Sequence, residues 1–132
     1  MKYILDTNTI IYFFKGEGNI SRRLLSFPPK EISIPAIVYY ELLFGIFKSS
    51  RQKEKIQQLR LLIDATNLIP FAEKEADAAA KIRVDLEKRG VPIGPLDVLI
   101  AATALAHRAI LVTHNLKEFK RIDSLEIEDW FD

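Results

Sequence analysis

The feature that most constrains the fold is an alternation of short apolar segments with longer segments of helical period. The apolar segments are short and bounded by turn residues, which is typical of buried strands; they comprise residues 3–5, 31–34, 68–71, 109–112 and, as an edge strand, 125–127. Helices are predicted over residues 10–15, 21–27, 35–45, 51–64, 73–88 and 96–107. This order predicts one α/β domain over residues 1–132, with helices on both faces of a mainly parallel sheet.

The composition excludes several classes of protein. The chain has no cysteine, so disulfides, thiolate zinc sites and cysteine nucleophiles are excluded. No apolar stretch approaches the ~18 residues of a membrane span, and Asp6 interrupts the first apolar run, so no signal peptide is expected. We therefore expect a cytoplasmic protein. The net charge of +1 means that a nucleic-acid partner would have to be attracted by local basic patches.

Polar residues follow two of the predicted strands directly. Asp6 comes after residues 3–5, and Thr113, His114 and Asn115 come after residues 109–112. In open parallel sheets, functional residues gather at the carboxyl ends of the strands. Asp6 could instead simply cap the helix that follows it.

Two further acids lie on predicted helix faces that are otherwise apolar. Glu41 shares its face with Val38 and Phe44, and Asp97 stands at the top of a stripe that continues through Ala101. Glu41 could reach water from the edge of its stripe, and Asp97 could complement the helix dipole. One hypothesis covers these two acids and Asp6 together, namely carboxylates that converge to hold a hard divalent cation.

Four stretches carry a resemblance that covers nearly the whole chain. They are I-L-D-T-N, P-A-I-V-Y-Y-E-L-L-F-G, I-G-P-L-D-V-L-I-A-A-T-A-L and L-V-T-H-N-L-K-E-F-K-R-I, in this order. The sequence resembles PIN-domain ribonucleases, specifically the VapC-type toxins of toxin–antitoxin pairs. The resemblance implies a three-layer α/β/α sandwich. It also implies an acidic pocket that binds Mg²⁺, or Mn²⁺ in its place, and activates water to hydrolyse single-stranded or looped RNA, such as tRNA or rRNA.

The resemblance also implies the roles of individual residues. It places the catalytic, metal-binding acids at Asp6, Glu41 and Asp97, and it places supporting polar residues at Thr7, Asn8 and Thr113. The fourth acidic position of the family falls on Asn115, which offers an oxygen ligand without a charge. Whether one or two metals bind therefore stays open. Glu118 is an alternative to Asn115 for the fourth acidic position, although a supporting or exposed position fits Glu118 better.

Basic residues and histidines are assigned only in part by the sequence. Basic residues cluster at Lys48, Arg51, Lys53, Lys55 and Arg60 and again at Lys117, Lys120 and Arg121. We expect most of them to form solvated helix faces, with one or two in contact with phosphates. His107 and His114 lack the spacing of a zinc site, and His114 is placed at the rim of the acidic pocket.

The resemblance further implies a homodimer and a VapB-type antitoxin, through which operator DNA would be bound. The C-terminal segment of the antitoxin would occupy an apolar groove, with candidates Ile11, Tyr12, Phe13, Phe14, Phe44 and Phe47. Alternatives remain a PIN nuclease of RNA maturation, a phosphatase with an aspartate nucleophile, a receiver-like phosphoacceptor domain and a PIN-like module that binds RNA or protein without cutting. The phosphatase reading is weakened because Asn8 stands where that class needs a second acid.

Overall fold

A five-stranded sheet forms the centre of the computed structural model, which describes residues 2–132. The strands are β1 (Tyr3–Leu5), β2 (Ile32–Pro35), β3 (Asn67–Ile69), β4 (Ile110–Val112) and β5 (Ile127–Glu128). They lie in the order β3-β2-β1-β4-β5, and all four neighbouring pairs are parallel. The predicted α/β class with a parallel sheet is confirmed.

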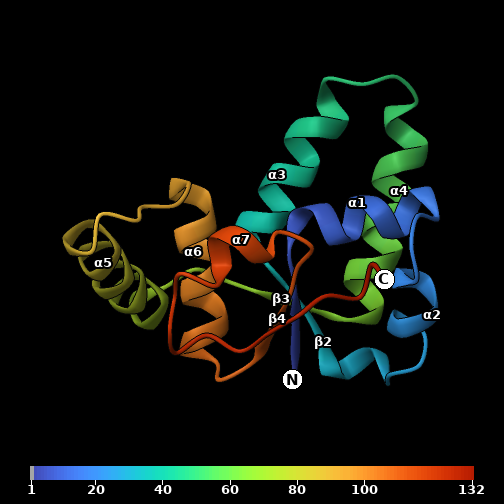
Figure 1. Cartoon of the computed structure of the whole chain (residues 1–132). Helices are drawn as coiled ribbons and strands as arrows, with labels where there is room; N and C mark the ends of the chain where they lie inside the picture. Colours follow the sequence, from blue (N-terminus) through green and yellow to red (C-terminus); the bar gives the residue numbers. More distant parts are fainter. Residues whose placement is uncertain (1) are drawn as a thin grey trace.

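Helices cover both faces of this sheet, which makes the three predicted layers. They are α1 (Thr7–Lys15), α2 (Ile20–Leu24), α3 (Ala36–Phe47), α4 (Gln52–Ala65), α5 (Glu73–Lys88), α6 (Pro95–Ala106) and α7 (Leu116–Phe119), with a 3₁₀ turn, η1 (Pro29–Glu31). Figure 1 shows α1, α2 and α4 on one side of the sheet and α5 and α6 on the other. The hairpin of α3 and α4 extends beyond the sheet, at the top of that view.

The strand order creates a switch point between β1 and β4. The chain passes from β1 through β2 to β3 in one direction, and then crosses back to add β4 on the far side of β1. Because such crossovers are right-handed, the helices of the two halves lie on opposite faces and leave a crevice where the direction reverses. Leu5 pairs with Val112 there. Asp6 and Thr113 therefore leave the sheet side by side.

The core explains why α6 is so rich in alanine. Ile100, Ala101 and Ala104 are fully buried, and the small side chains let α5 and the sheet approach α6 closely. At the ends of this helix pair, the buried carboxylate of Glu75 accepts a hydrogen bond from the backbone N–H of Ala72 (2.9 Å). It also pairs with Nε2 of His107 at 2.6 Å. His107 therefore connects α6 to α5.

Several predicted boundaries shift because side chains cap or terminate the elements. α1 begins at Thr7 rather than Ile10, because Asp6 accepts a hydrogen bond from the Thr7 N–H and caps the helix. The helix predicted over residues 21–27 ends at Leu24. Phe27 instead packs against two other aromatic rings, those of Tyr3 and Trp130.

Other differences are small and fall at sheet edges and helix ends. Pro35 ends β2 and precedes α3, although the sequence analysis placed it as the first helical residue. β3 and β5 lie one or two residues away from the predicted segments, at 67–69 and 127–128. Strand ends at sheet edges have few neighbours to fix their register. No helix within residues 2–132 combines the length and the apolar character needed to cross a membrane.

Candidate active site

Asp6 is the most buried acid at the carboxyl edge of the sheet, with 5% of its surface exposed. Its Oδ1 accepts a hydrogen bond from the backbone N–H of Thr7 (2.7 Å), and its Oδ2 accepts one from Oγ1 of Thr113 (2.8 Å). Burial raises the pKa of Asp6, and the nearby charges of Glu41 and Glu118 raise it further, against the effect of the two hydrogen bonds. Asp6 is both the cap of α1 and a member of an acidic cluster.

Glu41 reaches the same edge from α3. Its Oε1 accepts a hydrogen bond from Oγ1 of Thr7 at 2.7 Å. α1 is itself fixed over the sheet, because Oγ1 of Thr9 donates to the carbonyl oxygen of Val112 (3.2 Å). The threonines of the first turn of α1 thus connect Glu41 on one side to β4 on the other.

Asp97 and Glu118 form a hydrogen-bonded carboxyl pair between α6 and α7. Burial, this hydrogen bond and the charges of Asp6 and Glu41 raise the pKa of Asp97 to about 7. The hydrogen bonds from Asp97 and from the amide of Asn115 lower the pKa of Glu118. Asp97 is therefore the carboxyl of the pair that holds a proton more readily than an ordinary aspartate, whereas Glu118 favours the ionised form.

The turn after β4 connects the acids to one another. Oγ1 of Thr113 donates to Asp6 and accepts from the backbone N–H of Asn115 (3.0 Å). Nδ2 of Asn115 donates to Oε2 of Glu118 at 2.6 Å. Glu118 is therefore part of the cluster itself, and its place three residues after Asn115 at the start of a short helix is the sequence signal for this contact.

The structure brings most of the predicted site residues together, and one stands apart. Seven of them are connected by hydrogen bonds or by mutual electrostatic effects: Asp6, Glu41, Asp97, Thr7, Thr113, Asn115 and Glu118. Asn8 is exposed on the first turn of α1 and makes no hydrogen bond to these residues. The catalytic and metal-binding roles of all of them stay predictions.

The donor atoms suit a hard cation, but their present arrangement does not yet form a metal site. Carboxylate, amide and hydroxyl oxygens are the ligands that Mg²⁺ prefers. Within residues 2–132, however, no three histidine, cysteine, aspartate or glutamate side chains are arranged to hold a metal ion. The hydrogen bonds of Thr7 to Glu41 and of Asp97 to Glu118 occupy oxygens that a cation would use. Cation binding would therefore require these hydrogen bonds to rearrange.

His114 is held by the C-terminal tail. Its Nδ1 lies 2.9 Å from Oδ2 of Asp129, and its ring stacks on Phe131 with centroids 4.4 Å apart. Tyr12 packs edge-on against both rings. Tyr12 therefore faces the tail, and its predicted place in the apolar groove is not where the structure puts it.

An apolar groove does run between α1, α3 and α4, with a volume of about 340 Å³. Ile11 and Phe14 line it as predicted, opposite Leu42 and Ile46, and Glu41 stands on its wall. Phe44 and Phe47 are more than half exposed and do not line the groove, and Phe13 is partly buried against the core. The groove thus leads directly to the acidic cluster.

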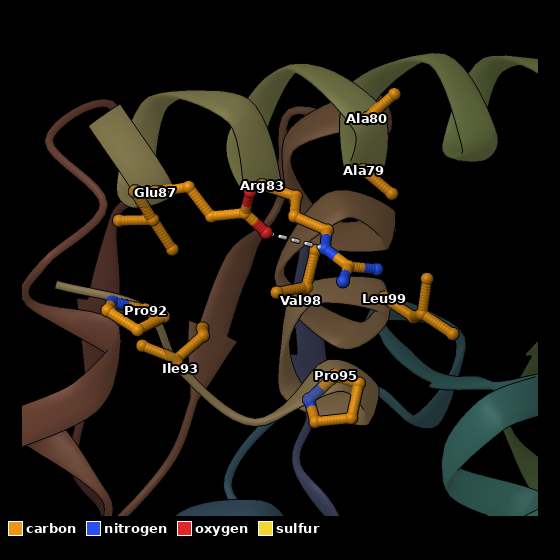
Figure 2. A pocket seen from close by; sticks show the side chains of 10 residues that line it. Ala79, Ala80, Arg83, Glu87, Pro92, Ile93, Pro95, Val98 and Leu99 are labelled. Atoms are coloured by element: carbon orange, nitrogen blue, oxygen red, sulfur yellow. Dashed lines mark hydrogen bonds and ion pairs between the residues drawn. The ribbon is translucent and has the colours of Figure 1, made fainter. Parts of the chain in front are cut away.

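A second cavity lies elsewhere, between α5 and α6, and measures about 450 Å³. Figure 2 shows Val98 and Leu99 of α6 facing Ala79 across it, with the ion pair of Arg83 and Glu87 (2.9 Å) above. None of the acids of the cluster lines this cavity. It is therefore separate from the candidate active site.

Known proteins similar to this chain identify the family to which it belongs. The family model of the PIN domain matches residues 3–125. The ribonuclease VapC2 of Rickettsia felis is 36% identical over 132 residues, with 98% of each chain covered. This chain belongs to the PIN-domain family, among the VapC ribonucleases. The tRNA(fMet)-specific endonuclease VapC of Salmonella typhimurium is a further relative of this PIN domain, 32% identical over 130 residues and 98% of each chain.

A solved structure extends the likeness of this PIN domain to three dimensions. The VapBC2 complex of Rickettsia felis, bound to a DNA fragment from its promoter, contains a chain that superposes with a TM-score of 0.91 at 36% identity. The match covers 98% of this chain and 99% of that chain. The expected PIN fold and the resemblance to VapC toxins are confirmed.

The hydroxyl of Thr113 gives a testable contribution to the site. We expect Thr113→Val to lower the free energy of unfolding by about 1–3 kcal/mol, because it leaves Oδ2 of Asp6 and the N–H of Asn115 without a buried partner. Thr113→Ser retains the hydroxyl and is the matched control. Urea unfolding at neutral pH measures both variants. Equal loss in Val and Ser variants would assign the effect to packing rather than to the hydrogen bonds.

Proposed function

We propose that this chain is the toxin of a toxin–antitoxin pair, a cytoplasmic endoribonuclease that depends on Mg²⁺. One observation carries the proposal: Asp6, Glu41, Asp97 and Glu118 converge at the switch point of the sheet, in a chain of the VapC family. A cluster of four acids would destabilise an ordinary core. It is useful in a site that binds a cation and a phosphodiester.

The side chains of the cluster would have two roles, as ligands of the ion and as groups that orient those ligands. Asp6 and Asp97 would hold the ion, with Glu41 and Asn115 as further oxygen ligands. The bound ion would supply positive charge for the phosphate and lower the pKa of an attacking water. The chain fixes the ligands: Thr113 orients Asp6, as the hydrogen bond of 2.8 Å between them shows. Such oriented partners are what keeps ligand oxygens in place when a cation enters.

The family and the position of the site support a proposal for the substrate class. Since the Salmonella typhimurium relative is named as specific for tRNA(fMet), we propose that this chain cleaves a loop of a structured RNA, tRNA or rRNA. The acids lie at the carboxyl ends of the central strands, beside the starts of α1, α6 and α7. Unpaired nucleotides of a loop can reach such an edge, whereas a closed duplex presents its phosphates on a rigid cylinder.

The partner that this groove fits is the C-terminal segment of a VapB-type antitoxin. Ile11, Phe14, Leu42 and Ile46 provide an apolar bed, and Glu41 at its wall would pair with a basic side chain of the antitoxin. An occupant of this groove would cover the acids and exclude RNA. We further propose a homodimer, and operator DNA bound through the antitoxin, in keeping with the promoter complex of the Rickettsia felis relative.

The decisive experiment is metal-dependent cleavage of total cellular RNA. We expect discrete fragments with Mg²⁺ or Mn²⁺ and none with a chelator, and the mapped fragment ends identify the substrate. A phosphatase would instead release inorganic phosphate from an aryl phosphate under the same conditions. Intact RNA in every condition, with folded protein, would remove the ribonuclease proposal and favour a binding module.

A further inference from the structure

Positive charge is concentrated at one end of the α3–α4 hairpin. We define the arm as residues 44–55, which comprise the end of α3, the connecting turn and the start of α4. The arm carries four basic residues, Lys48, Arg51, Lys53 and Lys55, against one acid, Glu54, so its net charge is +3. Since the whole chain carries +1, the remaining residues carry −2. The arm extends beyond the sheet in Figure 1.

The basic side chains of the arm are not neutralised by the protein. None of the four forms an ion pair with any residue in 2–132, whereas basic residues further along α4 and on α5 do form such pairs. Lys48 lies over the ring of Phe44, with its Nζ 4.6 Å from the ring centroid. Unpaired cations on a projecting element leave a positive field that attracts polyanions.

The turn at the tip of the arm contains a basic residue in a strained conformation. Arg51 has a φ of 56° and lies in the left-handed region, where glycine or asparagine is the favourable residue. A side chain held at such a position against its intrinsic preference is a pointer to function rather than to folding. Arg51 thus places a positive charge in the turn at the end of the hairpin.

The arm is continuous with the acidic cluster through α3. Glu41, Phe44 and Lys48 follow one another at helical spacings of three and four residues, so they share one face of the helix. At 1.5 Å per residue, Lys48 lies about 10 Å further along the helix axis than Glu41. Phe44 is 56% exposed between them. A single-stranded RNA that extends from the acids along this face would contact the ring of Phe44 and then the basic side chains of the arm.

We propose that the arm binds the sugar–phosphate backbone of single-stranded RNA next to the cleaved bond. This inference rests on the proposed ribonuclease function and adds where the substrate is held. The acids of the cluster repel RNA, whereas the arm attracts it without a metal. Lys55 also lines the apolar groove, so an antitoxin in the groove and RNA on the arm compete for the same space.

The salt dependence of RNA binding tests the proposal. Binding of a fluorescent single-stranded RNA is measured by anisotropy over a series of potassium chloride concentrations, in chelator and in an Asp97→Asn background to prevent cleavage. The arm variant combines Lys48→Ser, Arg51→Gly and Lys53→Ser. The control combines Lys74→Ser, Lys81→Ser and Lys88→Ser on α5, three exposed lysines whose replacement changes the net charge equally.

We expect the arm variant to reduce the slope of log affinity against log salt by about 2, since each phosphate contact with a single strand contributes about 0.7. The control should keep the parent slope. Arg51→Gly alone should keep or raise the unfolding midpoint, because glycine favours this φ, so binding that this single variant loses does not reflect lost folding.

Equal slopes in the arm and control variants would overturn the proposal. So would an arm variant that loses self-association or antitoxin binding but keeps its RNA affinity, because the arm would then be a protein interface. Cleavage with Mg²⁺, measured with Asp97 intact, tests the ribonuclease proposal and the arm proposal separately. If wild type and arm variant cleave RNA equally well, the ribonuclease proposal holds and the proposal that the arm binds the substrate is wrong.

Discussion

Asp97→Asn is expected to reduce the cleavage rate by about a thousandfold. The substitution retains the shape of the side chain and its ability to donate to Glu118, but it removes the charge that the proposed cation needs. The loss should appear in kcat/KM for an RNA whose cleavage site has been mapped, with Mg²⁺ present. The pH dependence of the residual activity should lack the contribution from the ionisation of Asp97, because the amide has no proton to lose in that range.

The same substitution should stabilise the fold at neutral pH. Because burial and neighbouring charges raise the pKa of Asp97 to about 7 from an ordinary value of 3.8, the folded state binds a proton that the unfolded state releases. Stability therefore falls as pH rises through this interval, where the unfolded chain binds fewer protons. The raised pKa of Asp6 acts in the same direction. Asparagine stays neutral at every pH and avoids this loss.

Thermal unfolding in chelator measures the fall of stability with pH. The range from pH 5 to 8 covers about the interval in which Asp97 titrates in the folded state. We expect the wild-type midpoint to fall toward the upper end of the range, and the Asp97→Asn midpoint to fall less. Asp123→Asn, an exposed acid after α7, is the control and should follow wild type in both stability and cleavage. If the Asp97 variant unfolds at a lower temperature than wild type at pH 8, the carboxyl is a structural residue and its assignment to the site is wrong.

The fold was predictable because its signals are local and repeated. Each strand of the sheet is a short apolar segment beside a helical segment, and this alternation is enough to predict a parallel sheet. Caps and ends were less predictable, since they depend on single side chains. Asp6 starts α1 three residues early by accepting from Thr7, and Phe27 leaves the helical pattern to pack on Trp130.

The site was predictable only in outline from the residues themselves. Asp6 and Thr113 follow strands, so their proximity comes from the topology alone. The pairing of Asp97 with Glu118 depends on how α6 and α7 pack, which no local pattern specifies. Asn8 shows the opposite limit: it stands beside Asp6 in sequence, yet the turn of the helix points it to solvent. Sequence neighbours of an acid in the cluster therefore differ in whether they face the cluster, according to helix phase.

The contact between Trp130 and the first strand is also outside sequence prediction, and it has a large expected effect. We expect Trp130→Ala to lower the free energy of unfolding by about 3–5 kcal/mol, as for other buried aromatic residues. Trp130 is 1% exposed, stacks on Phe27 with centroids 5.3 Å apart and meets Tyr3 edge-on at 5.1 Å. Its Nε1 donates to Glu128 at 2.9 Å.

Such a loss is a large part of the roughly 5–15 kcal/mol that stabilises a typical domain, so the Trp130→Ala variant should be partly unfolded at physiological temperature. Urea unfolding gives the free energy, with Leu25→Ala as control because Leu25 is 77% exposed. Trp130→Phe should lose less, since it keeps the ring but not the hydrogen bond to Glu128. A loss below about 1 kcal/mol in the Ala variant would mean that the tail is not part of the cooperative unit. The contacts of Asp129 and Phe131 with His114 would then not be fixed by a stably packed tail. In that case only β4 and α7 would hold the turn that carries Thr113.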